Sequence, residues 1–183
     1  MTLDEIPAAR SIAEAGEARG QDRAWKARRR YFVPHAGAQT NAFFSQADEL
    51  FYGGAAGGGK SALLCGLAIE EHRKSIIFRR EYSQIKGLLD EVRRQIGTRG
   101  GYAAMHRLWR LPKGNELEFG SVPREDDKEK YQGRAHDLKA FDEITHFSES
   151  QYRFLIGWNR SAEGRRCRVV AAGNPPISAE GAW

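Results

Sequence analysis

Short apolar runs alternate along the chain with segments of helical periodicity. Residues 50–52, 75–80, 138–141 and 167–172 are apolar or β-branched runs and predict strands, the first of them short and buried. Strands that alternate with helices are typical of an α/β fold on a parallel sheet with right-handed crossovers. We therefore expect one α/β domain.

Three segments between these runs predict helices. Residues 82–96 show the clearest amphipathic pattern, and Ser148 is a suitable N-cap for a helix that continues to about residue 158. A third helix is predicted directly after residue 61. The inward-facing positions are Ala62, Leu63, Leu67 and Ala68, then Ile85, Leu88, Leu89, Val92 and Ile96, and finally Tyr152, Leu155 and Ile156.

A β-hairpin interrupts this alternation. Residues 107–111 and 116–121 flank Pro-Lys-Gly-Asn, a turn sequence, at 112–115. The charge run at 124–130 predicts a solvated turn or a short helix. The hairpin is expected as an insertion in the sheet.

Composition sets limits on the class of protein. With 183 residues, 40% hydrophobic and 29% charged, the chain can bury one real core, and no run is long enough to span a membrane. Residues 1–30 are rich in Ala, Glu and Arg and predict a basic N-terminal arm, poorly structured or helical. The net charge of +5 agrees weakly with a polyanionic partner. The two cysteines and five histidines lack metal-ligand spacing, and scattered surface or loop positions are expected for the histidines.

The glycine-rich stretch 53–61 carries the strongest chemical signal. From Gly54 to Ser61 it fits G-x-x-x-x-G-K-[ST], in which backbone N–H groups wrap phosphates and glycines leave room for that approach. Its lysine reaches the β and γ phosphates and its serine hydroxyl takes a place on Mg²⁺. A flexible linker is the alternative, but the strand before and the helix after favour a nucleotide-binding loop. The residues expected to bind nucleotide are Gly54, Ala55, Ala56, Gly57, Gly58, Gly59, Lys60 and Ser61.

Two further strand ends carry polar residues. In open α/β sheets, ligands lie at the carboxyl ends of the strands. Asp142 and Glu143 end one strand, where the first could hold Mg²⁺ and the second could polarise the water that attacks a γ-phosphate. Asn174 ends another and could sense that phosphate, although Gly-Asn-Pro is also an ordinary turn. The composition does not decide which of Arg79, Arg80 and Arg134 supplies a further cation.

These motifs together resemble the ATPase domain of the large terminase subunits of tailed bacteriophages. The loop at 52–61 looks like the Walker A motif of that family, Phe141-Asp142-Glu143 like its Walker B motif, and 172–175 like its coupling motif. Pro34, Gly37 and Gln39 resemble the upstream segment that contacts adenine. The segment 130–134 resembles the stretch that precedes Walker B. The resemblance covers about residues 31–183.

The resemblance implies a P-loop NTPase of the type with an additional catalytic glutamate (ASCE), whose parallel sheet is sandwiched by helices. It implies ATP and Mg²⁺ as cofactors, with Ser61 and Asp142 on the metal, Glu143 activating water, Asn174 coupling, and Arg79 and Arg134 as candidate arginine fingers. It further implies packaging of double-stranded viral DNA with a portal protein and a small terminase subunit, in a homo-oligomeric ring in the bacterial cytoplasm.

The sequence departs from the family after the coupling motif. It ends at Trp183, so we expect a fragment or a truncated prophage gene without the nuclease domain. In such ATPases the strand before the Asn174-type residue inserts between the Walker A and Walker B strands. The strand at 50–52 is then expected to have an uncovered edge. Two other functions stay open: a helicase-like motor, and a non-catalytic remnant that binds nucleotide or DNA.

Overall fold

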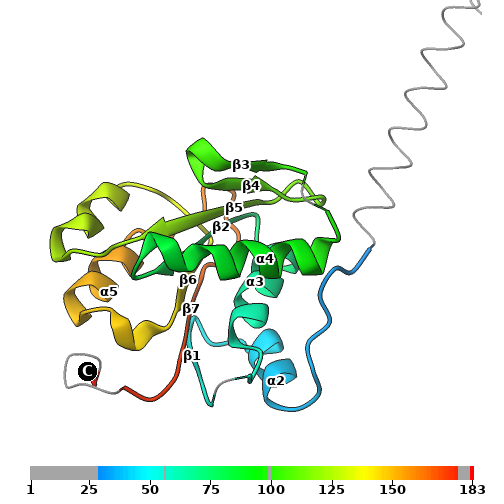
Figure 1. Ribbon diagram of the computed structural model, residues 1–183, viewed down its shortest axis with the longest axis horizontal. Helices are drawn as coiled ribbons and strands as arrows, with labels where there is room; N and C mark the ends of the chain where they lie inside the picture. Colours follow the sequence, from blue (N-terminus) through cyan, green and yellow to red (C-terminus); the bar gives the residue numbers. More distant parts are fainter. Residues whose placement is uncertain (1–28, 56, 99, 177–181) are drawn as a thin grey trace, which may run out of the picture. The chain divides into compact units, whose positions relative to one another are not determined.

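The predicted α/β architecture is confirmed by a computed structural model, which describes residues 29–55, 57–98, 100–176 and 182–183. Tyr31–Trp183 form one compact unit on a seven-stranded, mostly parallel sheet (Figure 1). The arm predicted for residues 1–30 lies almost wholly outside the described residues.

The elements follow the predicted alternation of strands and helices. The strands are β1 (Glu49–Gly53), β2 (Lys74–Arg79), β3 (Tyr102–Ala103), β4 (Leu108–Arg110), β5 (Glu116–Ser121), β6 (Leu138–Asp142) and β7 (Arg168–Gly173). The α-helices are α2 (Ala38–Phe44), α3 (Lys60–Glu70), α4 (Ile85–Ile96) and α5 (Glu149–Ile156). Short 3₁₀ helices are η2 (Tyr82–Gln84), η3 (Ala104–His106), η4 (Glu125–Tyr131) and η5 (Ile144–His146).

The strand order is β1-β7-β6-β2-β5-β4-β3. The pairs from β1 to β5 are parallel, whereas β4 pairs antiparallel with β5 and with β3, which confirms the inserted hairpin. The strand β7 lies between β1 and β6, as expected for the strand that precedes Asn174. The carboxyl ends of β1, β7, β6 and β2 therefore meet at one edge of the sheet.

Helices cover both faces of the sheet, because side chains alternate along each strand. Ile77, Ala140 and Val170 belong to the core cluster that includes α3 and α4. Their neighbours in sequence, such as Phe78 and Phe141, belong to the cluster beneath α5 and η4. The two cores hold the strand ends rigidly between them.

The helix after the loop is buried more completely than its sequence predicts. Residues 63–69 of α3 are all buried, including Leu64, Cys65 and Ile69 outside the predicted inward face. The cause is that α2, α4 and the sheet surround α3, so no side of the central part of this helix faces solvent.

The prediction that the strand at 50–52 is buried is wrong. Every residue of β1 is exposed or half-buried, and Phe51 is 60% exposed. Within the described part of the chain β1 pairs only with β7, so it is an edge strand and one side stays open. The expected uncovered edge is thus confirmed for the described residues.

Local predictions elsewhere have mixed outcomes. Ser148 is the N-cap of α5, where its hydroxyl accepts a hydrogen bond from the Gln151 N–H at 3.1 Å. The charge run forms the short helix η4. His72 and His136 lie in the connections before β2 and β6, as expected for loop positions, but they are buried and not on the surface. No helix among the described residues is long and apolar enough to cross a bilayer.

Candidate functional site

The loop between β1 and α3 requires glycine at its last turn. Gly59 caps α3 in the left-handed region, with φ of 68°. A Cβ atom at this position would lie 2.4 Å from Nε2 of Gln39, so the Gln39 side chain would have to leave its present position. Gly54 and Gly57 also have positive φ angles, of 147° and 84°. The loop conformation therefore depends on glycine at several points.

Gln39 ties the upstream segment to this loop. The side chain is buried, and its Nε2 donates to the Gly59 carbonyl at 2.9 Å while its Oε1 accepts from the His35 N–H at 2.6 Å. Tyr52 adds a second tie, since its hydroxyl donates to the Gly58 carbonyl at 3.2 Å. Gln39 thus contacts the loop itself. Ala56, another residue expected to bind nucleotide, lies outside the described residues.

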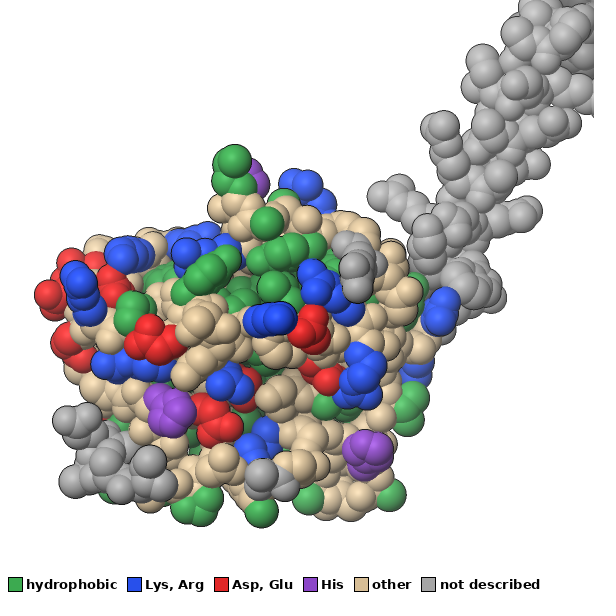
Figure 2. Space-filling view, viewed as in Figure 1, with side chains coloured by type: hydrophobic (Ala, Val, Ile, Leu, Met, Phe, Trp, Pro, Cys, Tyr) green, Lys and Arg blue, Asp and Glu red, His purple; other side chains and the backbone are tan. Residues whose placement is uncertain are grey.

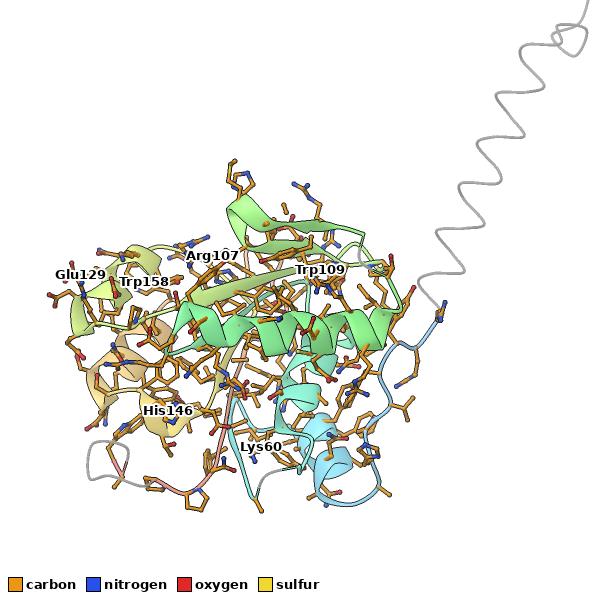
Figure 3. The ribbon with its side chains drawn as sticks, viewed as in Figure 1. Lys60, Arg107, Trp109, Glu129, His146 and Trp158 are labelled. Carbon is orange, nitrogen blue, oxygen red and sulfur yellow. The ribbon has the colours of Figure 1, made fainter. Side chains whose placement is uncertain are left out.

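Lys60 is a nearly buried cation that no carboxylate neutralises in the described part of the chain. It lies at the first position of α3 (Figure 3), and only 8% of it is exposed. Its ammonium group donates to the carbonyls of Gly54 and Ala55 at 2.8 Å each and to Oδ1 of Asn174 at 2.9 Å. All three acceptors are neutral. An anion that reached this group would find a desolvated positive charge without a competing counter-ion.

Asn174 connects Lys60 to Glu143. Its side-chain oxygen accepts from Lys60, and its backbone N–H donates to Oε2 of Glu143 at 3.3 Å. The Glu143 backbone is left-handed, with φ of 59°, a conformation that is rare outside glycine. This backbone turns the half-buried Glu143 side chain back toward the end of β7. Asn174, whose sequence context also fits an ordinary turn, therefore contacts both Lys60 and Glu143.

Ser61 and Asp142 form the adjacent contact. The serine hydroxyl lies 3.2 and 3.1 Å from the two carboxylate oxygens of Asp142, a side chain that is 1% exposed. Burial raises the pKa of Asp142 above the ordinary value, and the neighbouring Arg79 and Ser61 offset part of that rise. Hydroxyl and carboxylate oxygens are the ligands that Mg²⁺ prefers, so this pair fits a magnesium ion.

No group of three or more His, Cys, Asp or Glu side chains in the described residues is placed to hold a metal by itself. This is compatible with Mg²⁺, which is commonly held by one or two protein ligands together with substrate phosphates and water. Ser61 and Asp142 would be the protein's share of such a site.

The three candidate arginines lie in different surroundings. Arg79, at the end of β2, donates to Asp142 and so belongs to the site. Arg80 instead donates to Oε1 of Gln151 at 2.9 Å and to the His146 carbonyl at 3.2 Å, an arrangement that anchors α5. Arg134 pairs with Glu118 at 2.8 Å, and the structure does not bring it to Lys60 or Asp142.

Comparison with known proteins supports the fold rather than a family. No family model matches the sequence, and no curated protein matches it. Among solved structures, the chain is similar to the crystal structure of the HK97 bacteriophage large terminase, with a TM-score of 0.56 and 11% sequence identity. The match covers 86% of this chain but only 38% of the terminase, so the similarity concerns part of that protein. The chain has a terminase-like fold.

Proposed function

We propose that this chain binds ATP with Mg²⁺ and hydrolyses it, as a P-loop ATPase of the ASCE type. The observation that carries the proposal is the convergence of Lys60, Asn174 and Glu143 at the carboxyl ends of β1, β6 and β7. A cation without a counter-ion, a neutral sensor and a carboxylate in contact with that sensor are the parts that phosphoryl transfer to water requires.

Each side chain has a distinct role in this proposal. Lys60 and the backbone of residues 54–60 bind the β and γ phosphates, and Ser61 and Asp142 hold Mg²⁺, which neutralises charge on those phosphates. Glu143 orients the attacking water and accepts its proton as the new P–O bond forms and ADP leaves. Asn174 detects the loss of the γ-phosphate through its contacts with Lys60 and Glu143. Gln39 secures the loop from upstream.

Arg79 is the preferred arginine for the transition-state charge, because it already lies beside Asp142. Arg134 would have to act on a neighbouring subunit. The terminase-like fold favours a DNA-packaging context, in which double-stranded DNA, a portal protein, a small terminase subunit and a homo-oligomeric ring are the proposed partners.

The proposal is tested with the purified chain by titration of a fluorescent ATP analogue and by steady-state hydrolysis, with and without double-stranded DNA. Lys60→Ala should abolish nucleotide binding, whereas Glu143→Gln should keep binding and lose turnover. Lys86→Ala and Glu71→Gln, two exposed positions away from the loop, are the matched controls and should change neither property. Normal hydrolysis by Glu143→Gln would refute the role of that carboxylate, and binding without turnover in the unmodified chain would favour a non-catalytic nucleotide-binding protein.

A further inference from the structure

The starts of the parallel strands gather cations at the edge of the sheet opposite the candidate ATP site. Arg73 and Lys74 stand at the start of β2, Arg134 precedes β6, and Arg160 and Arg166 precede β7. At their other ends, β2 ends in Arg79, β6 ends in Asp142, and β7 ends one residue before Asn174. Because β2, β6 and β7 are parallel, one edge carries the candidate catalytic groups and the other carries this row of basic residues.

A groove crosses this basic edge. One hollow of about 120 Å³ is lined by Arg73, Arg160 and others, and a second of about 490 Å³ is lined by Arg134, His106 and others. The two hollows share Lys74, Ala135 and His136 in their linings, so they are adjacent along the starts of β2 and β6. The groove is therefore elongated rather than a single round pocket.

The acidic residues in this groove are already engaged. Glu118 pairs with Arg134 at 2.8 Å, and Glu163 pairs with Arg165 at 2.9 Å. Glu116, which also lines the second hollow, has Arg110 as its partner at 3.9 Å. The carboxylate of Asp137 accepts the backbone N–H groups of residues 73 and 74 at 2.8 and 2.9 Å. These acids are therefore not available as partners for the remaining cations of the groove.

Three cations of the groove have no carboxylate partner among the described residues. Arg73 donates to the Gly114 carbonyl and Arg160 to the Gly133 carbonyl, while no hydrogen bond of the Lys74 side chain occurs within the described part of the chain. All three residues are exposed to solvent. They are free to contact an anion that enters the groove.

Two further cations lie buried close behind this edge. Lys139 is fully buried, and among the described residues its ammonium group donates only to the Arg134 carbonyl, at 3.3 Å. Burial lowers the pKa of Lys139 to about 8, and repulsion from Arg134 and Arg160 contributes to the decrease, against attraction from Glu118. Arg168 is 3% exposed and donates to the carbonyls of Ala42 and Phe43, while its Nε has no partner in the described residues. The protein thus keeps positive charge at this edge in spite of the desolvation cost.

Many cations on other surfaces of the molecule are paired locally. On the face seen in Figure 2, basic and acidic side chains are interspersed. Along α4 and η4 the pairs are three residues apart: Arg93–Asp90, Arg94–Glu91, Lys128–Glu125 and Lys130–Asp127. The basic edge lacks such pairing for Arg73, Lys74 and Arg160, and these three cations line one hollow together.

We propose that this groove binds the backbone phosphates of double-stranded DNA. The proposal rests on the proposed function, because it places the polymer and the nucleotide at opposite ends of the same three strands. Exposed cations run through both hollows, since Arg73, Lys74 and Arg160 line the first and Lys74 and the Glu118-paired Arg134 line the second. Such an elongated basic groove suits a ligand with regularly repeated phosphates, whereas a single phosphate group would need only one of the hollows. The nucleotide phosphates have their own loop at the other edge. The strands β2, β6 and β7, whose central residues are buried, then connect the two sites.

The test measures binding of a labelled DNA duplex of random sequence to the full chain by fluorescence anisotropy over a range of salt concentrations. We compare Arg73→Gln/Lys74→Gln/Arg160→Gln with Lys86→Gln/Arg94→Gln/Arg153→Gln, which removes the same charge from exposed positions of α4 and α5 outside both hollows. The groove variant should bind DNA at least about tenfold more weakly at moderate salt, and the slope of log K against log salt should decrease by about two to three. The control should stay within about twofold of the unmodified chain.

Lys74→Gln alone covers the case in which the triple variant fails to fold, because it removes no hydrogen bond seen in the described residues; it should reduce the salt slope by about one. DNA binding by the groove variants equal to that of the unmodified chain would overturn the proposal, as would an equal loss in the control. Tighter binding of polyglutamate than of DNA would also overturn it, in favour of an acidic protein partner. Binding of the ATP analogue to the same variants is measured separately, so failure of the groove is distinguished from failure of the ATP site.

Discussion

Arg79 donates a hydrogen bond from Nε to Oδ2 of Asp142 at 2.8 Å, and its Nη2 forms an ion pair with the same oxygen at 2.6 Å. The Ser61 hydroxyl contacts both oxygens of the same carboxylate. The group proposed to hold Mg²⁺ is therefore neutralised by an arginine in this structure. A metal ion at Ser61 and Asp142 would compete with the Arg79 guanidinium for the carboxylate, which would free Arg79 to turn toward a phosphate.

Removal of this arginine should destabilise the protein in a manner that Mg²⁺ can correct. Arg79→Gln leaves Asp142 buried without a counter-ion, and since the Arg79 side chain is 20% exposed we expect a loss of about 1 to 3 kcal/mol in the free energy of unfolding. Millimolar Mg²⁺ should restore more stability to this variant than to the unmodified chain. Denaturant melts with and without Mg²⁺ measure both quantities.

Arg80→Gln is the matched control for this prediction, because Arg80, the neighbour of Arg79 in sequence, contacts an amide and a carbonyl rather than a carboxylate. It should lose some stability without gaining any added response to Mg²⁺. An equal Mg²⁺ response in the two variants would show that the Arg79–Asp142 pair does not occupy the metal position.

Replacement of Asn174 by aspartate should weaken ATP binding. The new carboxylate would pair with the Lys60 ammonium group, which at present contacts only neutral oxygens, and the phosphates would have to displace it. We expect a decrease of about tenfold or more in affinity, the usual scale for a charged hydrogen bond. Asn174→Ala should instead retain binding and lose turnover. Equal affinity for ATP in Asn174→Asp and the unmodified chain would contradict the contact between these two residues.

Gly59→Ala should damage the loop through two separate effects. Alanine is strained at φ of 68°, and its Cβ would collide with Gln39, so we expect a loss of about 2 kcal/mol or more in stability together with weaker ATP binding. Gly87→Ala is the control, because Gly87 lies within α4 and a Cβ there meets nothing within 4 Å. This control should stabilise the chain by about 0.5 to 1 kcal/mol. Thermal melts of the two variants should therefore shift in opposite directions.

The sequence predicts the elements and the residues at the strand ends well, because periodicity and turn chemistry are local properties. The loop, Asp142, Glu143 and Asn174 come together since parallel strands must end at one edge of the sheet. The choice among Arg79, Arg80 and Arg134 depended on which strand pairs with which, and local sequence does not contain that information. The exposure of β1 and the burial of His72 and His136 have the same cause, namely long-range packing.

The buried histidine at the start of β2 should make the protein sensitive to acid. Burial lowers the pKa of His72 from 6.5 to about 4, although Asp137, with one oxygen 3.8 Å from the imidazole, attracts the protonated form. Between these two pH values the unfolded chain binds a proton that the folded chain excludes. Stability should therefore be complete above pH 6.5 and decline as the pH falls to about 4, by about 3 kcal/mol from this residue.

Burial also lowers the pKa of His136, so this second histidine acts in the same direction. Urea melts across this pH range measure the slope of stability against pH. His72→Gln should reduce that slope, whereas His106→Gln, at an exposed position in η3, should leave it unchanged. An unaltered slope in His72→Gln would mean that His72 becomes protonated in the folded state as readily as in the unfolded chain. In that case the desolvation of this side chain would have to be relieved by Asp137, through a close ion pair that compensates the cost of burial.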